Sequence, residues 1–328
     1  MSFSSKFLAL ALFVVAQPGF AADSPIPAAA TPPAPAAAPG SKGPIEVYLI
    51  GGQSNATGQG YVKNFPPGFK PDERVLLFHS GGRSLHGALP SNVWHVLAPA
   101  SEDPSRFGME IGFGNRLQEL RPDRKIALIK HATSGTNLYT QWNPGPDATD
   151  PTKWGPQFKI FADTVDAGLK ALRDDGYVPT VKGMLWHQGE NDGNRPDTAN
   201  AYATNLTHFI ERVRAQYGTP DMCFVLGTIL PQPNYPAPTP PNTEIVRQAQ
   251  FNLAQNSGSP LAVKGVFTVV TDKMTRRADD PGISPALSHD YLHLSSAANL
   301  EMGQLMADEV NAYLVSRESE PPIEHHSP

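Results

Sequence analysis

The feature that most constrains the fold is an alternation of short apolar runs with longer stretches of helical periodicity. The apolar runs have the length and composition of strands buried on both faces. They are Ile45 to Ile50, Lys125 to Lys130, Val181 to Trp186, Cys223 to Ile229 and Gly265 to Val270. Between them, apolar residues recur three or four positions apart, as in amphipathic helices, in the stretches Phe113 to Leu120, Phe158 to Leu172, Tyr202 to Val213 and Ile245 to Leu253.

A last helix is expected to begin at a Ser295-Ser296 cap and to carry apolar residues from Met302 to Leu314 along one side. Strands that alternate with helices form a parallel sheet covered by helices on both faces. We therefore predict a single α/β domain with a central parallel sheet. Because strand-helix-strand crossovers are right-handed, the loops that follow the strands should all lie at the same edge of that sheet.

These loops carry the polar residues that are candidates for a site. They are Gly51 to Asn55, His131 to Asn137 and His187 to Asp192 after the first three strands, and Ser288 to His293 before the last helix. A serine on the sharp turn that leaves a buried strand holds its hydroxyl at the edge where open α/β sheets bind ligands. Ser54 has that position.

Acyl transfer requires a set of groups for which these loops supply candidates. Ser54 would attack the substrate, His293 would accept its proton as the general base, and Asp290 would hold the imidazole in the correct tautomer. The oxyanion would be bound by the backbone N–H groups of Ser54 and Gly135 and by one side-chain amide, from Gln188 or Asn191.

The same loops resemble the conserved blocks of SGNH (GDSL-type) hydrolases, in the sialate O-acetylesterase-like group close to carbohydrate esterase family 6. The matching segments are Gly52-Gln53-Ser54-Asn55, Ser134-Gly135-Thr136-Asn137-Leu138 with Trp142, Trp186-His187-Gln188-Gly189-Glu190, and Asp290-Tyr291-Leu292-His293-Leu294. The resemblance covers residues 44–317. It implies a flavodoxin-like three-layer α/β/α fold, a Ser-His-Asp triad, no metal or other cofactor, and removal of acetyl groups from polysaccharide or sugar hydroxyls.

The third block contains two overlapping forms of the motif, Gln188 to Glu190 and Gly189 to Asp192, and each form offers a different amide donor. We favour Gln188 as the donor and hold Asn191 in reserve. Gln53, Asn55, His187 and Glu190 are interpreted as supporting residues that hold the site loops in place.

Flat aromatic side chains near the predicted edge are candidates for contact with a sugar ring. Tyr139, Trp142 and Trp154 follow the second strand, and the proline-rich segment Pro231 to Pro236 follows the fourth. The alternative is that Trp142 and Trp154 only seal the edge of the core.

The ends of the chain are not expected to join the folded domain. Residues 1–22 have the positive charge, short apolar stretch and small-residue cleavage site of a secretory signal peptide, which predicts a secreted or periplasmic protein without stable membrane insertion. Residues 23–43 are rich in Ala and Pro and read as a semi-rigid linker, and residues 318–328 read as a loose tail.

Two alternatives to a serine esterase remain open. His289 and His293 have the i, i+4 spacing of a zinc site, which requires both residues to lie on one helix. A non-catalytic carbohydrate-binding protein on an esterase scaffold is the other, because a fold does not guarantee activity. The formal net charge of -5, with no basic stripe, argues against nucleic acid as a partner. The sequence leaves the oligomeric state open.

Overall fold

A seven-stranded sheet runs through the middle of the fold in the order β4-β3-β6-β1-β7-β8-β9. The structure is a computed structural model that describes residues 42–81, 89–231 and 242–319. The strands of this sheet are β1 (Gly43–Gly52), β3 (Leu76–His79), β4 (His95–Val96), β6 (Ile126–Ala132), β7 (Tyr177–His187), β8 (Cys223–Gly227) and β9 (Val266–Val269). All neighbouring strands are parallel except β4, which pairs antiparallel with β3. A small second sheet pairs β2 (Gly60–Tyr61) with β5 (Arg106–Phe107).

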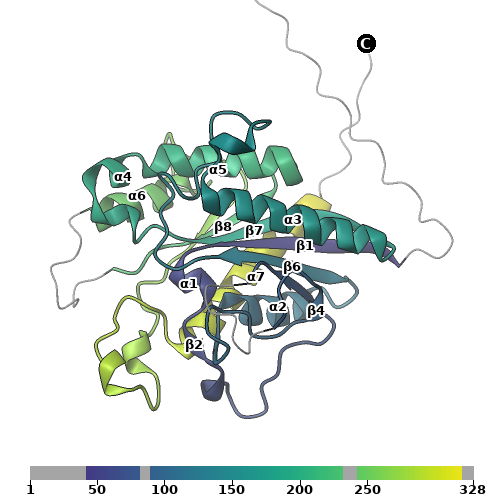
Figure 1. Cartoon of the computed structure of the whole chain (residues 1–328), viewed down its shortest axis with the longest axis horizontal. Coiled ribbons are helices and arrows are strands. Elements are labelled where there is room, and N and C mark those ends of the chain that lie inside the picture. Colours follow the sequence, from purple (N-terminus) through teal and green to yellow (C-terminus); the bar gives the residue numbers. More distant parts are fainter. Residues whose placement is uncertain (1–41, 82–88, 232–241, 320–328) are drawn as a thin grey trace, which may run out of the picture. The chain divides into compact units, whose positions relative to one another are not determined.

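Helices cover both faces of the large sheet. One face carries α3 (Pro156–Asp174), α4 (Pro196–Asn200), α5 (Tyr202–Tyr217) and α6 (Thr243–Leu253); the opposite face carries α2 (Met109–Leu120) and α7 (Ser296–Glu318) (Figure 1). The short helix α1 (Ser54–Thr57) follows β1 directly. Single 3₁₀ turns are η1 (Val62–Asn64), η2 (Pro151–Lys153), η3 (Asp192–Asn194), η4 (Arg277–Asp279) and η5 (Pro285–Leu287).

The alternation of side chains along β1 divides the core into two layers. Val47 and Leu49 pack into the cluster that contains the buried residues of α3, α5 and α6. Tyr48 and Ile50 point the other way and pack against α2 and α7. Because both faces of the strand are covered, apolar residues point to both sides of it, and Glu46 is its one charged residue.

The predicted three-layer α/β/α fold is confirmed. Each predicted apolar run overlaps a strand, and each predicted helical stretch overlaps a helix. Numbered by chain order among the predicted strands, β6-β1-β7-β8-β9 has the order 2-1-3-4-5 of flavodoxin-like folds. The Ser295 side chain accepts a hydrogen bond from the Ala298 N–H, so α7 begins at the predicted cap.

Two features extend the prediction. Strands β3 and β4 lengthen the sheet beyond β6; both are short, and their pairing depends on contacts that only the assembled sheet provides. At the C-terminus, α7 continues to Glu318, whose carboxylate pairs with Arg121 at 2.5 Å. Glu318 therefore belongs to the domain, and the predicted boundary of the tail is wrong by at least that residue.

The predicted start of the domain at residue 44 is too late by at least one residue. Gly43, assigned to the linker, is the first residue of β1, and Lys42 N–H donates to the Gly176 carbonyl at 2.8 Å. The signal peptide and the rest of the linker lie outside the described residues. Within the described part of the chain, no helix combines the length and apolar character needed to cross a bilayer.

Candidate active site

Ser54 lies where β1 ends and α1 begins, at the carboxyl edge of the sheet. Gly52 makes this turn possible: its φ is 138°, and a Cβ there would lie 2.0 Å from the His187 carbonyl oxygen. The Gln53 N–H donates to the same carbonyl at 2.9 Å. The turn is thus held against the end of β7. It places Ser54 between two strands whose loops diverge, which is where a sheet of this order binds ligands.

Asp290 and His293 occupy the loop between η5 and α7. Both carboxylate oxygens of Asp290 lie within hydrogen-bonding distance of His293 Nδ1, at 3.0 and 2.9 Å, and one also accepts the His293 backbone N–H at 3.2 Å. Burial tends to raise the pKa of Asp290, but the hydrogen bond and charge of His293 and the nearby charge of Arg277 outweigh it, so that the pKa lies below its ordinary value. A carboxylate at Nδ1 places the ring proton there and leaves Nε2 as the acceptor, as a general base requires.

Asn55 joins the serine turn to the histidine loop. Its side-chain oxygen accepts the Leu294 N–H at 2.9 Å, and its amide donates to the Leu292 carbonyl at 3.3 Å. The residues on either side of His293 are therefore bonded to the residue that follows Ser54. Among the described residues, the Ser54 hydroxyl and the His293 ring share no hydrogen bond; in unliganded enzymes such bonds are often long and shorten when substrate binds.

Two backbone N–H groups remain available for an oxyanion. In the described part of the chain, no hydrogen bond occupies the N–H of Ser54 or that of Gly135. Gly135 has a φ of 70°, a left-handed conformation that turns the loop after β6. Asn191 Nδ2 donates to the Gly135 carbonyl at 2.5 Å, so this amide lies beside the same loop.

The preference for Gln188 as an oxyanion donor is wrong. Gln188 is fully buried, and its amide nitrogen lies 3.2 Å from Gln53 Oε1, 3.0 Å from the Thr136 carbonyl and 2.6 Å from Asp192 Oδ2. The Gln188 amide is therefore occupied by acceptors within the protein, and it holds three site loops together. Asn191, which is only partly buried, takes its place as the candidate donor.

Asp192 is a site residue whose role the sequence reasoning missed. Asp192 is the last residue of the Gly189-to-Asp192 form of the third block, and this position in the motif was the signal that could have identified it. Its carboxylate accepts the N–H groups of Leu138 and Tyr139 at 2.8 and 3.1 Å, in addition to the Gln188 amide. Burial raises the pKa of Asp192 to about 6 against the effect of these donors. Asp192 thus holds the loop after β6 against the loop after β7.

His187 and Glu190, predicted as supporting residues, lie beside each other at the end of β7. Glu190 Oε1 accepts from the Asn55 amide at 3.0 Å and lies 3.8 Å from His187 Nδ1. Burial lowers the pKa of His187, so the ring is neutral at neutral pH. Glu190 therefore supports Asn55, which in turn holds the loop of His293.

A buried ion pair beneath the serine helix was also missed. Lys130, on β6, donates to Glu110 at 2.6 Å and to the Thr57 carbonyl at 2.9 Å, and so anchors the end of α1. Glu102 accepts the Ser134 N–H at 2.8 Å and holds the adjacent loop. A lysine inside an apolar strand was the available signal, because an unpaired charge there would be costly.

The predictions for the three aromatic residues have different outcomes. Trp142 is fully buried, packs edge-on against Trp186 at 5.0 Å and donates to Thr136 Oγ1, so the prediction that it contacts sugar is wrong. Trp154 is partly buried and packs against Phe158. Tyr139 is 40% exposed and stays a candidate contact. Of the proline-rich segment, residues 232–236 lie outside the described residues.

The structural context that a zinc site required for His289 and His293 does not occur. The segment that contains both residues is a loop of turns and bends that ends before α7, and His293 Nδ1 is bonded to Asp290. Among the described residues, no group of three or more His, Cys, Asp and Glu side chains has a geometry that could hold a metal ion.

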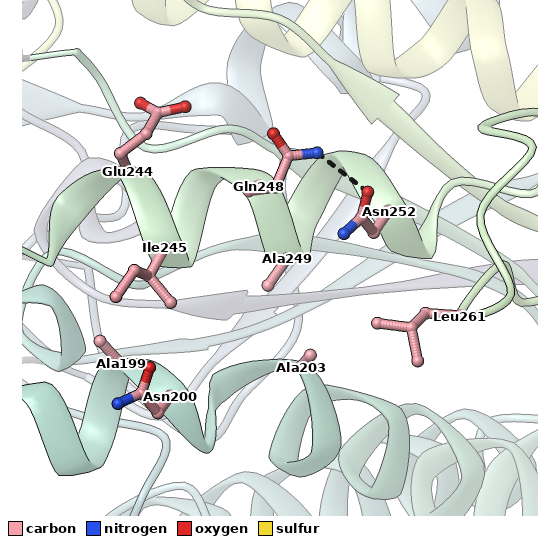
Figure 2. Close-up of a pocket in the computed structure, with 9 residues that line it drawn as sticks. All are labelled: Ala199, Asn200, Ala203, Glu244, Ile245, Gln248, Ala249, Asn252 and Leu261. Atoms are coloured by element: carbon pink, nitrogen blue, oxygen red, sulfur yellow. Dashed lines mark hydrogen bonds between the residues drawn. The ribbon is translucent and has the colours of Figure 1, made fainter.

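A cavity of about 440 Å³ lies elsewhere, between α6 and the helices α4 and α5 (Figure 2). Ile245 and Ala249 of α6 face Ala199 and Ala203 across it, whereas the Gln248 side chain bonds to Asn252 along the helix. Its walls contain no nucleophile and no histidine. This cavity has none of the groups that acyl transfer requires, and it is not the candidate active site.

Comparison with known proteins identifies the family of the chain. Residues 44–312 match the family model described as carbohydrate esterase, sialic acid-specific acetylesterase. A probable carbohydrate esterase of Arabidopsis thaliana is 21% identical over 287 residues, which cover 83% of this chain and 91% of that protein.

Solved structures share the fold. An Arabidopsis thaliana protein superposes with a TM-score of 0.58 at 20% identity, covering 83% of this chain and 98% of the other. NanS superposes with a TM-score of 0.59 at 16% identity, with the same coverage of 83% and 98%. A carbohydrate acetylesterase from Xanthomonas citri gives a TM-score of 0.52 at 16% identity, covering 81% of this chain and 57% of that one. Because the family model spans most of the sequence and includes all four site loops, this chain belongs to the sialic acid-specific acetylesterase family of carbohydrate esterases.

Proposed function

We propose that this protein is a serine carbohydrate esterase that removes O-acetyl groups from sugar hydroxyls through an acyl-enzyme intermediate. The observation that carries the proposal is the connection from Ser54 through Asn55 to the loop of the Asp290–His293 pair. It supports the proposal because it links a strand-end serine to an imidazole whose Nδ1 faces a carboxylate. These are the parts of a hydrolytic triad.

In the first half of the reaction, Ser54 Oγ attacks the carbonyl carbon of the acetyl group while His293 Nε2 accepts the serine proton. The developing oxyanion is bound by the N–H groups of Ser54 and Gly135 and by the Asn191 amide. When the tetrahedral intermediate collapses, the bond to the sugar oxygen breaks. The imidazolium returns its proton to that oxygen, so the sugar leaves as an alcohol and the acetyl group stays on Ser54.

In the second half, water attacks the acetyl carbon and gives a proton to His293. The bond to Ser54 Oγ breaks, the imidazolium returns the proton to the serine oxygen, and acetic acid leaves and ionises to acetate in solution. Asp290 stays ionised throughout and stabilises each imidazolium. The depressed pKa of Asp290 supports this role, because the carboxylate remains charged across the whole range in which histidine titrates.

Family membership supports acetylated sugars as the substrate class. The Xanthomonas citri neighbour is described as a carbohydrate acetylesterase. The choice among acetylated xylan, pectin, sialic acid and other glycans depends on the rim of the site, and measuring acetate release across a panel of these polymers would identify the substrate.

The test is hydrolysis of a small aryl acetate, with labelling by a fluorophosphonate. Ser54→Ala should lose several orders of magnitude in kcat and all labelling, and mass spectrometry should find the wild-type label on Ser54. Ser288→Ala is the matched control, because that serine lies in the same loop as Asp290 but, among the described residues, its hydroxyl bonds only to the Pro285 carbonyl. It should retain both activity and label.

Other outcomes identify the alternatives. Activity that survives Ser54→Ala but is lost with EDTA would support a metal-dependent hydrolase. Folded wild-type protein that binds acetylated sugars without releasing acetate would support a binding protein.

We also propose that the chain is exported, on the basis of the signal-like residues 1–22. Expression in a secreting bacterial host should give a mature protein whose N-terminus follows Ala21 or Ala22. Cytoplasmic protein that retains Met1 would contradict export.

A further inference from the structure

Arg277 lies beside the proposed triad and contacts Asp290, the carboxylate that also bonds to His293. It begins η4, and its side chain is 4% exposed. Its backbone runs beside the histidine loop: the Arg277 N–H donates to the His293 carbonyl at 2.8 Å, and Arg276 and Leu294 form an antiparallel bridge. The segments that carry Arg277 and His293 are therefore fixed relative to each other.

The guanidinium contacts three groups. Nη1 lies 3.4 Å from Asp290 Oδ2 and 3.1 Å from Gln59 Oε1, and Nη2 donates to the Tyr61 hydroxyl at 2.6 Å. The Tyr61 ring lies under the guanidinium, 5.0 Å away. Among the described residues, Asp290 is the only carboxylate that forms an ion pair with Arg277. Asp290 Oδ2 is therefore shared between the guanidinium and His293 Nδ1, which is 2.9 Å from it.

Gln59 connects this pair to the nucleophile. Its amide lies 3.4 Å from the Ser54 carbonyl and 3.3 Å from Thr57 Oγ1, while its oxygen accepts from Arg277. The contacts thus run from the carboxylate of the triad to the helix that carries the serine. The geometry couples the positions of Asp290 and Ser54.

An arginine remains protonated at every pH relevant to activity. Beside a carboxylate that already bonds to an imidazole, its charge opposes formation of the imidazolium. The other charged groups in this region have partners of their own. Asp103 pairs with Arg106, Asp280 accepts from Ser296 at the start of α7, and Glu190 bonds to Asn55. The neighbouring His187 is buried and neutral.

We propose that Arg277 is a positioning residue that acts through Asp290: it holds the carboxylate against His293 and sets the pH at which the histidine becomes an effective base. This inference rests on the proposed serine esterase function. It concerns a residue outside every motif that the sequence displays.

The main test is the pH dependence of kcat/KM for a small aryl acetate in Arg277→Gln. Without the cation, Asp290 stabilises the imidazolium unopposed, so the midpoint of the acid limb should move about one pH unit higher. The plateau should fall about tenfold, because the carboxylate is less well held. KM for the small ester should not change.

Arg106→Gln is the matched control. Arg106 also donates to Gln59 Oε1 and lies near the Tyr61 ring, but its ion pair is with Asp103. It should leave the midpoint unchanged. Arg277→Lys keeps the positive charge but loses the two guanidinium nitrogens that contact separate partners. The plateau of kcat/KM should therefore fall, while the midpoint of its acid limb should not move.

Coupling to Asp290 is tested in an Asp290→Asn background, where adding Arg277→Gln should lower the plateau no further, because no carboxylate remains for the guanidinium to hold. A uniform loss at every pH in Arg277→Gln, with an unchanged midpoint, would overturn the proposal and leave a structural role. If Arg277→Gln does not fold, Arg277→Lys tests the proposal by itself. This variant retains the charge, so a shift of about one pH unit in the midpoint of its acid limb would contradict the inference.

Failure of the esterase proposal is detected separately. Hydrolysis that persists in Ser54→Ala would refute that function without bearing on Arg277. In that case, NMR titration of the His293 ring gives a readout independent of activity. A higher midpoint in Arg277→Gln than in wild type supports the role of Arg277, and equal midpoints overturn it.

Discussion

At the scale of single residues, the choice of oxyanion amide depends on neighbours that are distant in the sequence. Gln188 and Asn191 lie in the same short block and carry the same functional group. Gln188 is buried among acceptors from three loops, whereas Asn191 reaches the Gly135 loop from the edge of the site. Only the one at the edge can face a substrate.

Substitution of the two amides should therefore give different results. Asn191→Ala should lower kcat on a small aryl acetate about 100-fold and leave the melting temperature nearly unchanged. Gln188→Ala should lower the melting temperature by several degrees, because it leaves the buried Thr136 carbonyl without its donor and removes one of the donors to Asp192. Equal losses of kcat in two stable variants would contradict this assignment.

Trp142 and Tyr139 provide a second pair. Trp142→Ala should reduce the free energy of unfolding by about 3–5 kcal/mol, because it empties a fully buried site. Tyr139→Ala should leave stability unchanged and lower kcat/KM about tenfold on an acetylated oligosaccharide, with little effect on an aryl acetate. Chemical denaturation and kinetics on both substrates test these expectations. A large stability loss in Tyr139→Ala would show that the ring is structural.

At the scale of elements, β6 carries polar residues through the core to the site. Lys130 and His131 both lie on this strand, and both are almost completely buried. His131 Nδ1 lies 2.6 Å from Ser80 Oγ, and Nε2 lies 3.0 Å from Gln157 Oε1. Because an amide oxygen can only accept, the ring proton is assigned to Nε2. The neutral ring satisfies both neighbours.

This arrangement predicts how stability depends on pH. Burial lowers the pKa of His131 to about 4, below the ordinary value of 6.5 that applies in the unfolded chain. The unfolded state therefore binds more protons between these values, so the stabilisation is complete above pH 6.5 and is lost as the pH falls towards 4. From the size of the shift, the loss is up to about 3 kcal/mol.

Urea denaturation at a series of pH values would measure this loss. His131→Asn should reduce the free energy of unfolding at pH 7.5, but the decline between pH 6.5 and 4 should be less steep than in wild type. His79, whose pKa burial also lowers to about 4, should make a second contribution. Parallel pH curves for wild type and His131→Asn would refute the prediction.

At the scale of the whole molecule, both hydrophobic clusters lie within residues 45–314. The first described residue, Lys42, still contributes: it pairs with Asp175 at 2.7 Å, and its carbonyl accepts from Lys125. The last turn of α7 is held by the ion pair between Glu318 and Arg121. The folded unit therefore extends slightly beyond the family match at both ends.

A chain that begins at Ser41 and ends at Ser319 should keep the melting temperature and kcat of the longer protein. A chain that begins at Ile45 should melt several degrees lower, because it lacks the start of β1 and the contacts of Lys42. Differential scanning calorimetry measures both. Loss of stability in the chain from Ser41 to Ser319 would show that residues outside the described part contribute to folding.

The sequence by itself determined the fold class and the edge of the sheet at which the strand-end loops lie, whereas the flavodoxin-like strand order was implied by the family resemblance. Periodicity is local, and the handedness of crossovers converts it into a sheet with one functional edge. The Ser54, Asp290 and His293 candidates follow from that edge and from residue chemistry. These are inferences that need only near neighbours along the chain.

The tertiary structure decided which side chains face the site and which are enclosed. Trp142 and Trp154 both looked suited to a sugar, but Trp142 is sealed beneath the helices of the α3 face. Arg277 carries no motif and acquires its role only because its loop packs beside the histidine loop. Burial and hydrogen-bond partnership depend on contacts between segments far apart in the chain, and a pattern of residue types does not record them.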